Sequence, residues 1–264
     1  MSGSLKIGII GGGGWLGSAI AAAILDARLV QPHDLSLSYR SEQPNRFGDC
    51  FWTSDNRQLA DRSDVILLSV RPADWRSLVV DARGKLVISV MAGIRIGQIA
   101  EHHATDRVVR SLPNAAAEVG KSYTPWIGSD SVTEQDRATV RAIFDACGTQ
   151  DEVSNESDID YLTGLSGSGP AFPALLAAAM MKDAVARGLH PDIARRAVNT
   201  VLIGTGRLLE RRDECPNDIV ASFVDYRGTT AAAIETMRSE GFDRSVARGL
   251  AVAFEKAVGM GGNS

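Results

Sequence analysis

Glycines are concentrated near the N-terminus, where residues 11–14 are all glycine and Gly17 follows shortly after. Counted from Gly12, they form the pattern Gly-x-Gly-x-x-Gly, with Gly14 and Gly17 in its second and third positions. An apolar run over residues 5–10 predicts a strand before the pattern, and alanine-rich sequence predicts a helix after it. Gly12 permits a tight turn, Gly14 a close approach of the backbone to a pyrophosphate, and Gly17 close packing of the helix. The segment therefore predicts a dinucleotide site, rather than a glycine turn that binds nothing. The predicted contacts are Gly12, Gly14, Trp15, Leu16 and Gly17.

The end of the second predicted strand, over residues 35–39, indicates which dinucleotide the site selects. NAD sites usually place an Asp or Glu there, about 20 residues after the glycines, to hold the ribose 2′-hydroxyl. This chain has Arg40 and Ser41 instead, with no carboxylate at the tip. A guanidinium pairs well with a 2′-phosphate, and a hydroxyl can donate a further hydrogen bond to it. The two residues therefore predict NADP rather than NAD, unless Arg40 is only a solvated surface charge.

The composition of the chain is that of a globular cytoplasmic protein. Its 264 residues are 44% hydrophobic and 23% charged, with a net charge of −4, so neither nucleic acid nor an anionic membrane is an expected partner. No apolar run reaches the roughly 18 residues that a membrane span needs. The three cysteines, Cys50, Cys147 and Cys215, are far apart. Their spacing favours a reducing compartment and argues against a disulfide framework or a zinc ribbon.

Two other groups of residues fail the patterns that would give them chemistry. The segment Ser166-Gly167-Ser168-Gly169 lacks the Gly-x-Ser-x-Gly spacing of a hydrolase nucleophile and has no strand ahead of it. The four histidines have no metal-ligand spacing, and the His102–His103 pair is expected on the surface. A nicotinamide enzyme needs neither group, because its cofactor supplies the hydride. No metal site is therefore predicted.

Two halves of different pattern must position these residues. In the first half, short apolar runs alternate with helical sequence, which is typical of an α/β fold with a parallel sheet. The predicted strands are residues 5–10, 35–39, 64–70, 85–90 and 108–109. After an acidic stretch at residues 152–160, only helices are predicted, over residues 171–187, 192–211, 229–238 and 242–258. We therefore predict a Rossmann-type dinucleotide-binding domain over residues 1–155 and an all-helical domain over residues 156–264.

Five segments, in order along nearly the whole chain, resemble motifs of the pyrroline-5-carboxylate reductase family. The family's motifs are Ala-Val-Lys-Pro, Ser-x-x-Ala-Gly, Arg-x-Met-Pro-Asn, Thr-Ala-Leu-Ser-Gly-Ser-Gly-Pro-Ala-Tyr and Gly-Thr-Thr. The similar segments here are Ser69-Val70-Arg71-Pro72, Ser89-Val90-Met91-Ala92-Gly93, Arg110-Ser111-Leu112-Pro113-Asn114, residues 163–172 and Gly228-Thr229-Thr230. The resemblance implies an NADP-dependent reductase that transfers hydride to a cyclic imine, converting pyrroline-5-carboxylate to L-proline.

The resemblance also implies roles for single residues. Thr230 would donate a hydrogen bond to the imine nitrogen, and the backbone N–H groups of Gly228 and Thr229 would bind the substrate carboxylate. Capping of the following helix is the alternative use of the two threonines. Ser168 is expected at the substrate as well. The residues implied at the cofactor are Asn56, Ser69, Val70, Pro72, Ala92, Gly93, Pro113 and Asn114. A helix cap is the alternative for Asn56, and a simple turn is the alternative for the Pro113-Asn114 pair.

The main departure from the family lies in the substrate loop, where Asp225-Tyr226-Arg227 stands in place of Ser-Pro-Gly. Arg227 could grip a substrate carboxylate, or it could pair with Asp225 and leave the site unchanged. Two alternatives therefore stay open, namely a different cyclic imine as substrate and a non-catalytic dinucleotide-binding homologue. The resemblance further implies a homodimer, with dimers able to form a ring, because the family's helical domains interlock between subunits.

Overall fold

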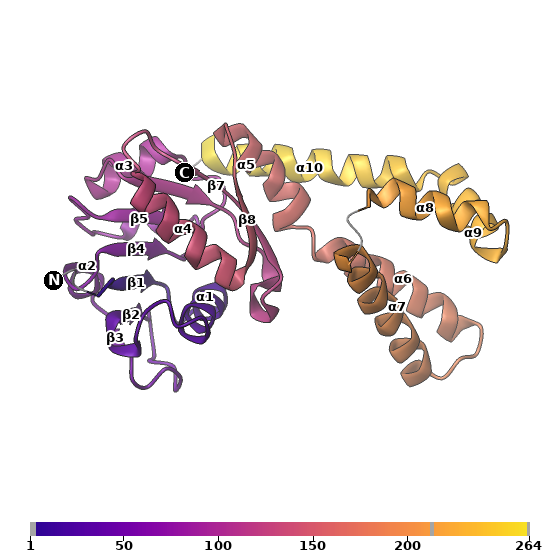
Figure 1. Cartoon of the computed structure of the whole chain (residues 1–264), viewed down its shortest axis with the longest axis horizontal. Coiled ribbons are helices and arrows are strands. Elements are labelled where there is room, and N and C mark those ends of the chain that lie inside the picture. The colour runs from indigo at the N-terminus through magenta and orange to yellow at the C-terminus, as the bar shows by residue number, and fades with distance from the viewer. Residues whose placement is uncertain (1–3, 212–213, 263–264) are drawn as a thin grey trace. The chain divides into compact units, whose positions relative to one another are not determined.

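The computed structural model describes residues 4–211 and 214–262, and Figure 1 shows the chain as a ribbon. The chain forms two compact units. The first comprises the residues up to Ser168 together with those from Val252 on, and the second is Gly169–Ala251. The division therefore falls after Ser168, whereas the sequence predicts a domain boundary after residue 155.

The first unit is built on an eight-stranded sheet in the order β3-β2-β1-β4-β5-β6-β7-β8. The neighbouring strands are parallel, except that β7 runs antiparallel to β6. The predicted α/β fold is confirmed, but the antiparallel pair and the strands β3, β7 and β8 were not expected. The sequence of β8 is polar and that of β7 contains Pro125, so neither shows an uninterrupted apolar run. The strands are β1 (Ile7–Ile10), β2 (Leu35–Ser38), β3 (Phe51–Thr53), β4 (Val65–Leu68), β5 (Leu86–Ser89), β6 (Val108–Ser111), β7 (Ser122–Gly128) and β8 (Gly148–Glu152).

Helices cover both faces of this sheet, because the central strands are apolar on both sides. Ile20 of α1 and Phe144 of α4 belong to one core cluster, which packs on one face. Leu59 of α2 and Ile99 of α3 belong to a second cluster on the other face. The helices of this unit are α1 (Trp15–Asp26), α2 (Asn56–Asp61), α3 (Ile96–His103), α4 (Glu134–Cys147) and α5 (Glu156–Leu162). The shorter turns are η1 (Pro32–Asp34), η2 (Trp75–Ser77), η3 (Ala115–Val119) and the π-helical η4 (Thr163–Gly167).

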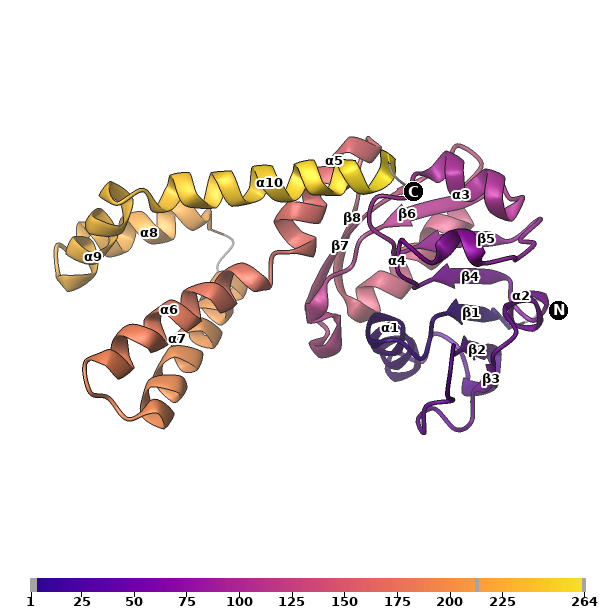
Figure 2. The ribbon, with the colours of Figure 1, turned by 180° about the vertical axis from the view of Figure 1, so that it is seen from behind.

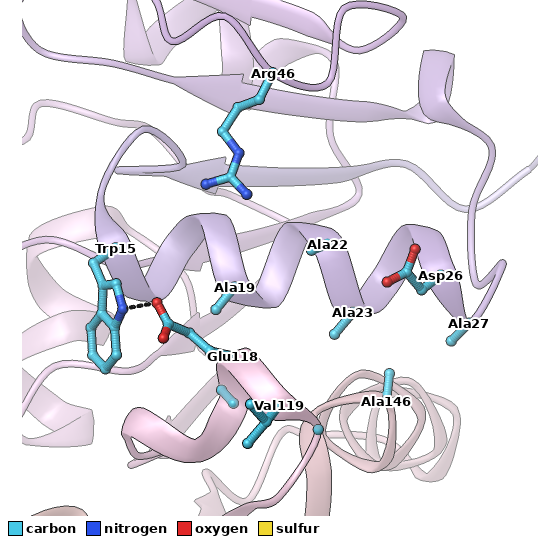
Figure 3. A pocket seen from close by; sticks show the side chains of 12 residues that line it. Trp15, Ala19, Ala22, Ala23, Asp26, Ala27, Arg46, Glu118, Val119 and Ala146 are labelled. Carbon is cyan, nitrogen blue, oxygen red and sulfur yellow. Dashed lines mark hydrogen bonds between the residues drawn. The ribbon is translucent and has the colours of Figure 1, made fainter. Parts of the chain in front are cut away.

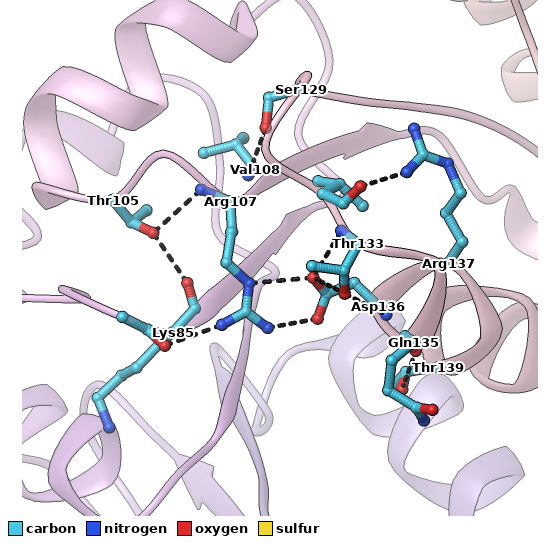
Figure 4. Close-up of polar contacts among 12 residues, drawn as sticks. Lys85, Thr105, Arg107, Val108, Ser129, Thr133, Gln135, Asp136, Arg137 and Thr139 are labelled. Atoms are coloured by element: carbon cyan, nitrogen blue, oxygen red, sulfur yellow. Dashed lines mark hydrogen bonds and ion pairs between the residues drawn. The ribbon is translucent and has the colours of Figure 1, made fainter.

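Buried ion pairs fasten helices to this sheet. Arg107 donates to both carboxylate oxygens of Asp136 in the first turn of α4, and Thr133 donates to the same carboxylate (Figure 4). Burial acts to raise the pKa of Asp136, but the hydrogen bonds from Arg107 and Thr133 outweigh burial and lower it. On β6, the fully buried Arg110 pairs with Asp160 of α5. This pair binds α5 to the sheet, which explains why the first unit continues past the predicted boundary.

The second unit consists of helices throughout its described residues, and Figure 2 shows them from behind. All four predicted helices are confirmed within a few residues, and α8 is additional. The helices are α6 (Ala171–Ala186), α7 (Pro191–Arg211), α8 (Pro216–Asp225), α9 (Thr229–Ser239) and α10 (Phe242–Gly262), which continues into the first unit. Many large apolar side chains stay exposed here, including Phe172, Leu175 and Ile203. In the described part of the chain, no helix is long and apolar enough to cross a membrane.

The expectation of a surface His102–His103 pair is wrong for His103, whose side chain is buried. Its Nδ1 lies 3.2 Å from the carbonyl oxygen of Val80, and its ring packs beside that of Trp75. Burial lowers the pKa of His103. His102 is exposed, because successive residues of α3 point in different directions and only one of the two faces the core.

Candidate active site

The tight turn after β1 depends on Gly11, one residue earlier than the sequence predicts. Gly11 has a φ of 84°, in the left-handed region that favours glycine. A Cβ atom on Gly11 would lie 2.2 Å from the carbonyl oxygen of Ser69, which follows β4. A Cβ on Gly12 would instead meet the side chain of Leu37, at 2.9 Å. The turn role predicted for Gly12 therefore belongs to Gly11, because the chain after β4 passes directly against it.

The first turn of α1 offers backbone N–H groups to a ligand. Gly14 is the N-cap, and the first bond of the helix runs from the N–H of Ser18 to the carbonyl oxygen of Gly14, at 2.9 Å. A Cβ on Gly17 would lie 2.4 Å from the carbonyl oxygen of Gly11, so the helix packs directly on the turn. The N–H groups that precede the first helical bond are those of Trp15, Leu16 and Gly17. A helix start of this kind binds a phosphate group.

The side chain of Trp15 connects this turn to a distant segment. Its indole N–H donates to a carboxylate oxygen of Glu118 in η3 (Figure 3). Trp15 is 55% exposed, and both side chains border a hollow of about 580 Å³ along the alanines of α1. The backbone N–H of Trp15 thus lies at the helix start where a phosphate is predicted, while its side chain connects η3 to the start of α1.

Two arginines converge on Asp74 at the edge of the sheet where β2 and β4 end. Nη1 of Arg40 lies 3.4 Å from Oδ2 of Asp74, and Nε of Arg71 donates to the same oxygen at 2.8 Å. Arg40 is 79% exposed, and Ser41 beside it is exposed too. Two guanidiniums that share one carboxylate keep a net positive charge, which suits a phosphate group. No cofactor contact is predicted for Arg71 from the sequence, although Arg71 occupies the basic position of the family's Ala-Val-Lys-Pro motif.

The predicted nicotinamide residues follow the ends of two neighbouring parallel strands. Ser69, Val70 and Pro72 come after β4, and Ala92 and Gly93 come after β5. None of these five residues is in the exposed class. The carboxyl ends of parallel strands meet at one edge of the sheet, so these residues share an edge with the glycine turn after β1. The fold therefore brings this predicted set together.

Asn56 stands at the first position of α2, but it does not cap that helix. The cap is Asp55, whose Oδ1 accepts a hydrogen bond from the N–H of Arg57 at 2.9 Å. The capping alternative for Asn56 is therefore wrong. Its contact with an adenine ribose stays a prediction.

Asn114 has a structural use for both ends of its side chain. Its Oδ1 caps η3 by accepting from the N–H of Ala116 at 2.9 Å, and its Nδ2 donates to the carbonyl oxygen of Ser166 at 3.0 Å. Pro113 and Asn114 are both buried. The turn alternative for this pair is thus supported, and the side chain of Asn114 fixes the segment around Ser166. The contact of the pair with a nicotinamide stays a prediction.

Ser168 caps the C-terminal end of the π-helical turn η4, and the division between the two units falls directly after it. Its side chain is exposed, and its hydroxyl donates to the carbonyl oxygen of Thr163 at 3.3 Å. π-helical turns occur frequently at functional sites. This turn is anchored from two sides, by Asn114 at Ser166 and by Arg110 at the preceding helix α5.

The substrate loop forms the corner between α8 and α9 in the second unit. Gly228 is the N-cap of α9, and no side chain caps this helix. The capping alternative for Thr229 and Thr230 is therefore wrong, and the structure gives the Thr230 hydroxyl no hydrogen-bond partner among the described residues. Arg227, just before the cap, has a φ of 52°, a left-handed conformation that is uncommon for arginine.

Thr230 and Arg227 lie in separate depressions of this corner. Thr230 lines one of about 340 Å³, here called the Thr230 groove. Arg227 lines another of about 420 Å³ together with Gly228. No ion pair joins Asp225 to Arg227 in the described residues, so the pairing that would have neutralised Arg227 is absent. The residues of the Thr230 groove are Leu208, Ile219, Ser222, Phe223, Tyr226 and Thr230.

Known proteins share this arrangement along the whole chain. A family model described as pyrroline-5-carboxylate reductase dimerisation matches residues 156–260, and one described as NADP oxidoreductase coenzyme F420-dependent matches residues 6–93. The chain is 30% identical to a pyrroline-5-carboxylate reductase of Synechocystis, over 98% of this chain and 99% of that one. The chain belongs to the pyrroline-5-carboxylate reductase family. The pyrroline-5-carboxylate reductase of Arabidopsis thaliana is 28% identical, with 96% and 95% of the two chains covered.

Solved structures of the pyrroline-5-carboxylate reductase family have the same fold. A Plasmodium falciparum pyrroline carboxylate reductase, solved with NADP bound, is 26% identical with a TM-score of 0.86 and covers 97% of this chain and 98% of its own. The pyrroline-5-carboxylate reductase of Coxiella burnetii superposes with a TM-score of 0.88. The two groups of predicted residues lie in the parts that the family models match. The glycine turn lies in the part matched by the NADP oxidoreductase model, and Thr230 lies in the part matched by the dimerisation model.

Proposed function

We propose that this chain is an NADPH-dependent reductase of a cyclic imine, and that it reduces pyrroline-5-carboxylate to L-proline. The observation that carries the proposal is the match to a pyrroline-5-carboxylate reductase over 98% of the chain. The NADP bound to the Plasmodium falciparum relative supports the choice of cofactor. The absence of a carboxylate at the end of β2, where an NAD site needs one, supports the same choice.

The residues at the edge of the sheet fit NADPH. The first turn of α1 would hold the pyrophosphate, and Arg40 with Ser41 would hold the 2′-phosphate, helped by Arg71. When bound, the cofactor supplies the hydride. The residues proposed to line the nicotinamide side are Ser69, Val70, Pro72, Ala92, Gly93 and Pro113.

Thr230 is the proposed donor to the substrate nitrogen. In the reaction, hydride adds to the carbon of the protonated imine, the π electron pair of the C=N bond becomes a lone pair on nitrogen, and nitrogen keeps the proton that it already carries. A hydroxyl that donates to this developing lone pair favours that shift of charge. Among the described residues the Thr230 hydroxyl has no hydrogen-bond partner, which supports this role. The N–H groups of Gly228 and Thr229, at the positive end of α9, and Arg227 beside them are the proposed carboxylate contacts, and Ser168 is a further proposed substrate contact.

The proposed assembly is a homodimer in the cytoplasm, with a ring of dimers as a further level. The family model described as dimerisation, and the exposed apolar side chains of α6 to α10, support the dimer. The three free cysteines support a reducing compartment. Light scattering at low micromolar concentration tests the assembly. A stable, active species of 28.1 kDa, the mass of one chain, would contradict it.

The decisive test is NADPH oxidation with pyrroline-5-carboxylate, followed by a six-membered carboxylated imine and a cyclic imine without a carboxylate. Turnover of pyrroline-5-carboxylate with the highest kcat/KM is the expected result. Preference for one of the other imines would mean that the substrate is a different cyclic imine. Turnover of none of the three would favour a non-catalytic dinucleotide-binding homologue. Thr230→Ala should lower kcat/KM by about 1–3 kcal/mol of transition-state stabilisation, whereas Thr230→Ser keeps the hydroxyl and should retain most activity.

A further inference from the structure

The Thr230 groove contains an aromatic side chain that the proposed function leaves without a role. Tyr226 is 88% exposed, the highest fraction among the exposed large hydrophobic side chains of the described chain. It lines the groove of about 340 Å³ together with Thr230. A ring so accessible to water contributes little to folding, because its apolar surface is not removed from solvent. Its place in the groove therefore calls for a contact with something other than its own chain.

The backbone fixes the position of this ring at the corner. Tyr226 directly follows α8 with helical φ and ψ angles, and Arg227 then reverses the chain through its left-handed φ of 52°. A Cβ atom on Gly228 would lie 3.5 Å from Cδ1 of Tyr226 and 3.8 Å from Cε1. The ring therefore stands against Gly228, the proposed carboxylate contact, while it shares a groove with Thr230, the proposed donor to nitrogen.

The chemistry of a cyclic imine suits such a ring. The imine is flat around its C=N bond, and hydride adds to one of its two faces, which leaves the other face for the protein to cover. The protonated imine is also a cation, and an aromatic face attracts a cation. Among the other walls of the groove, Leu208, Ile219 and Phe223 are apolar and match the hydrocarbon part of a small ring, and Ser222 adds a polar side chain.

We propose that Tyr226 is a substrate-contacting and specificity-determining residue, whose ring covers one face of the protonated cyclic imine. This inference rests on the proposed function. The resembling family has proline at this position, a smaller and non-aromatic side chain. Tyrosine takes up groove volume that proline leaves free, so the favoured substrate class is a small, flat, five-membered iminium ring over larger rings.

The test compares Tyr226→Ala with Tyr226→Phe in the full-length protein, with NADPH saturating. Tyr226→Ala should raise KM for pyrroline-5-carboxylate roughly 2- to 30-fold, the range that loss of a cation–π contact covers. It should also raise kcat/KM for a six-membered imine relative to kcat/KM for the five-membered one. Tyr226→Phe keeps the ring and should retain the wild-type KM and ratio. Both variants should keep the wild-type thermal midpoint, because the side chain is exposed.

The outcomes separate this inference from the function it rests on. If the wild type is active, and if Tyr226→Ala has the same KM and the same ratio of kcat/KM between the two ring sizes as the wild type, the role of Tyr226 is overturned. A rise in KM of the same size in Tyr226→Phe also overturns it, because the hydroxyl rather than the ring face would then be responsible. A wild type that reduces no cyclic imine overturns the proposed function itself.

Discussion

Arg227→Gly should stabilise the protein while it weakens binding of a carboxylated substrate. Arg227 holds a φ of 52°, where the Cβ of an ordinary residue crowds the backbone and glycine is free of strain. Its positive charge also lies just before the N-terminus of α9, the positive end of the helix dipole. No side-chain hydrogen bond or ion pair of Arg227 with the described residues offsets these two costs.

The magnitude follows from three contributions. Relief of the left-handed conformation is worth about 1–2 kcal/mol, and removal of a cation from the helix N-terminus about 0.3–1 kcal/mol. Glycine also loses more conformational freedom on folding, which costs about 0.5–1 kcal/mol. The expected net gain in the free energy of unfolding is therefore about 1 kcal/mol. Arg227→Ala removes the charge but keeps the strained φ, so it should gain only the dipole contribution.

Urea unfolding followed by circular dichroism measures the difference, with all variants at one chain concentration because a dimer's stability depends on it. Ala104→Gly is a matched control. Ala104 ends α3 with a φ of 53°, so its replacement should release similar backbone strain, of about 1 kcal/mol before the glycine entropy cost. Ala104 has no proposed contact with the substrate, so this variant should leave KM unchanged.

The KM of Arg227→Gly tests the proposed contact between Arg227 and the substrate carboxylate. Arg227→Gly should raise KM for pyrroline-5-carboxylate by the factor that corresponds to about 1.5–3 kcal/mol of lost charge-assisted binding, with little change for a cyclic imine without a carboxylate. An Arg227→Gly protein no more stable than Arg227→Ala would refute the strain argument. Equal changes in KM for the imines with and without a carboxylate would refute the carboxylate contact.

Three further predictions test the cofactor site and the buried histidine. Arg40→Asp should raise the Kd of NADPH more than that of NADH. Arg83→Asp is the matched control, because Arg83 is equally exposed and is also paired with an aspartate. Arg83 precedes β5, at the opposite ends of the strands from the cofactor residues, so this variant should change neither Kd. Gly17→Ala should cost about 1–3 kcal/mol and weaken NADPH binding, because its Cβ would lie 2.4 Å from the carbonyl oxygen of Gly11. Gly97→Ala, in α3 with nothing within 4 Å of the new Cβ, should leave stability unchanged or raise it slightly. Burial lowers the pKa of His103 below its ordinary value of about 6.5, so the unfolded chain takes up a proton there before the folded chain does. Stability should therefore fall as the pH drops below about 6.5, and His103→Gln should flatten that fall.

The sequence by itself determined the class of the fold and the family of the chain, and it predicted the residues of the sites. Strands buried on both faces appear as continuous apolar runs, and residues 5–10 and 85–90 are of this kind. The spacing of Gly12, Gly14 and Gly17 predicts a helix start after the first strand, and a helix start involves only neighbouring residues. The order of five motifs along the chain also identified the family before any contact was known.

Other features were decided only by the tertiary structure, because they depend on what lies against a residue rather than on the residue itself. Gly11, and not Gly12, carries the strained turn, since the backbone at Ser69 passes 2.2 Å from its missing Cβ. Arg71 joins Arg40 only through Asp74, which comes from a different loop. The polar strand β8 forms because β7 offers it backbone hydrogen bonds, which side-chain hydrophobicity does not report. Whether Arg227 pairs with Asp225 was likewise undecided in the sequence, because the left-handed turn between α8 and α9 determines where each side chain points.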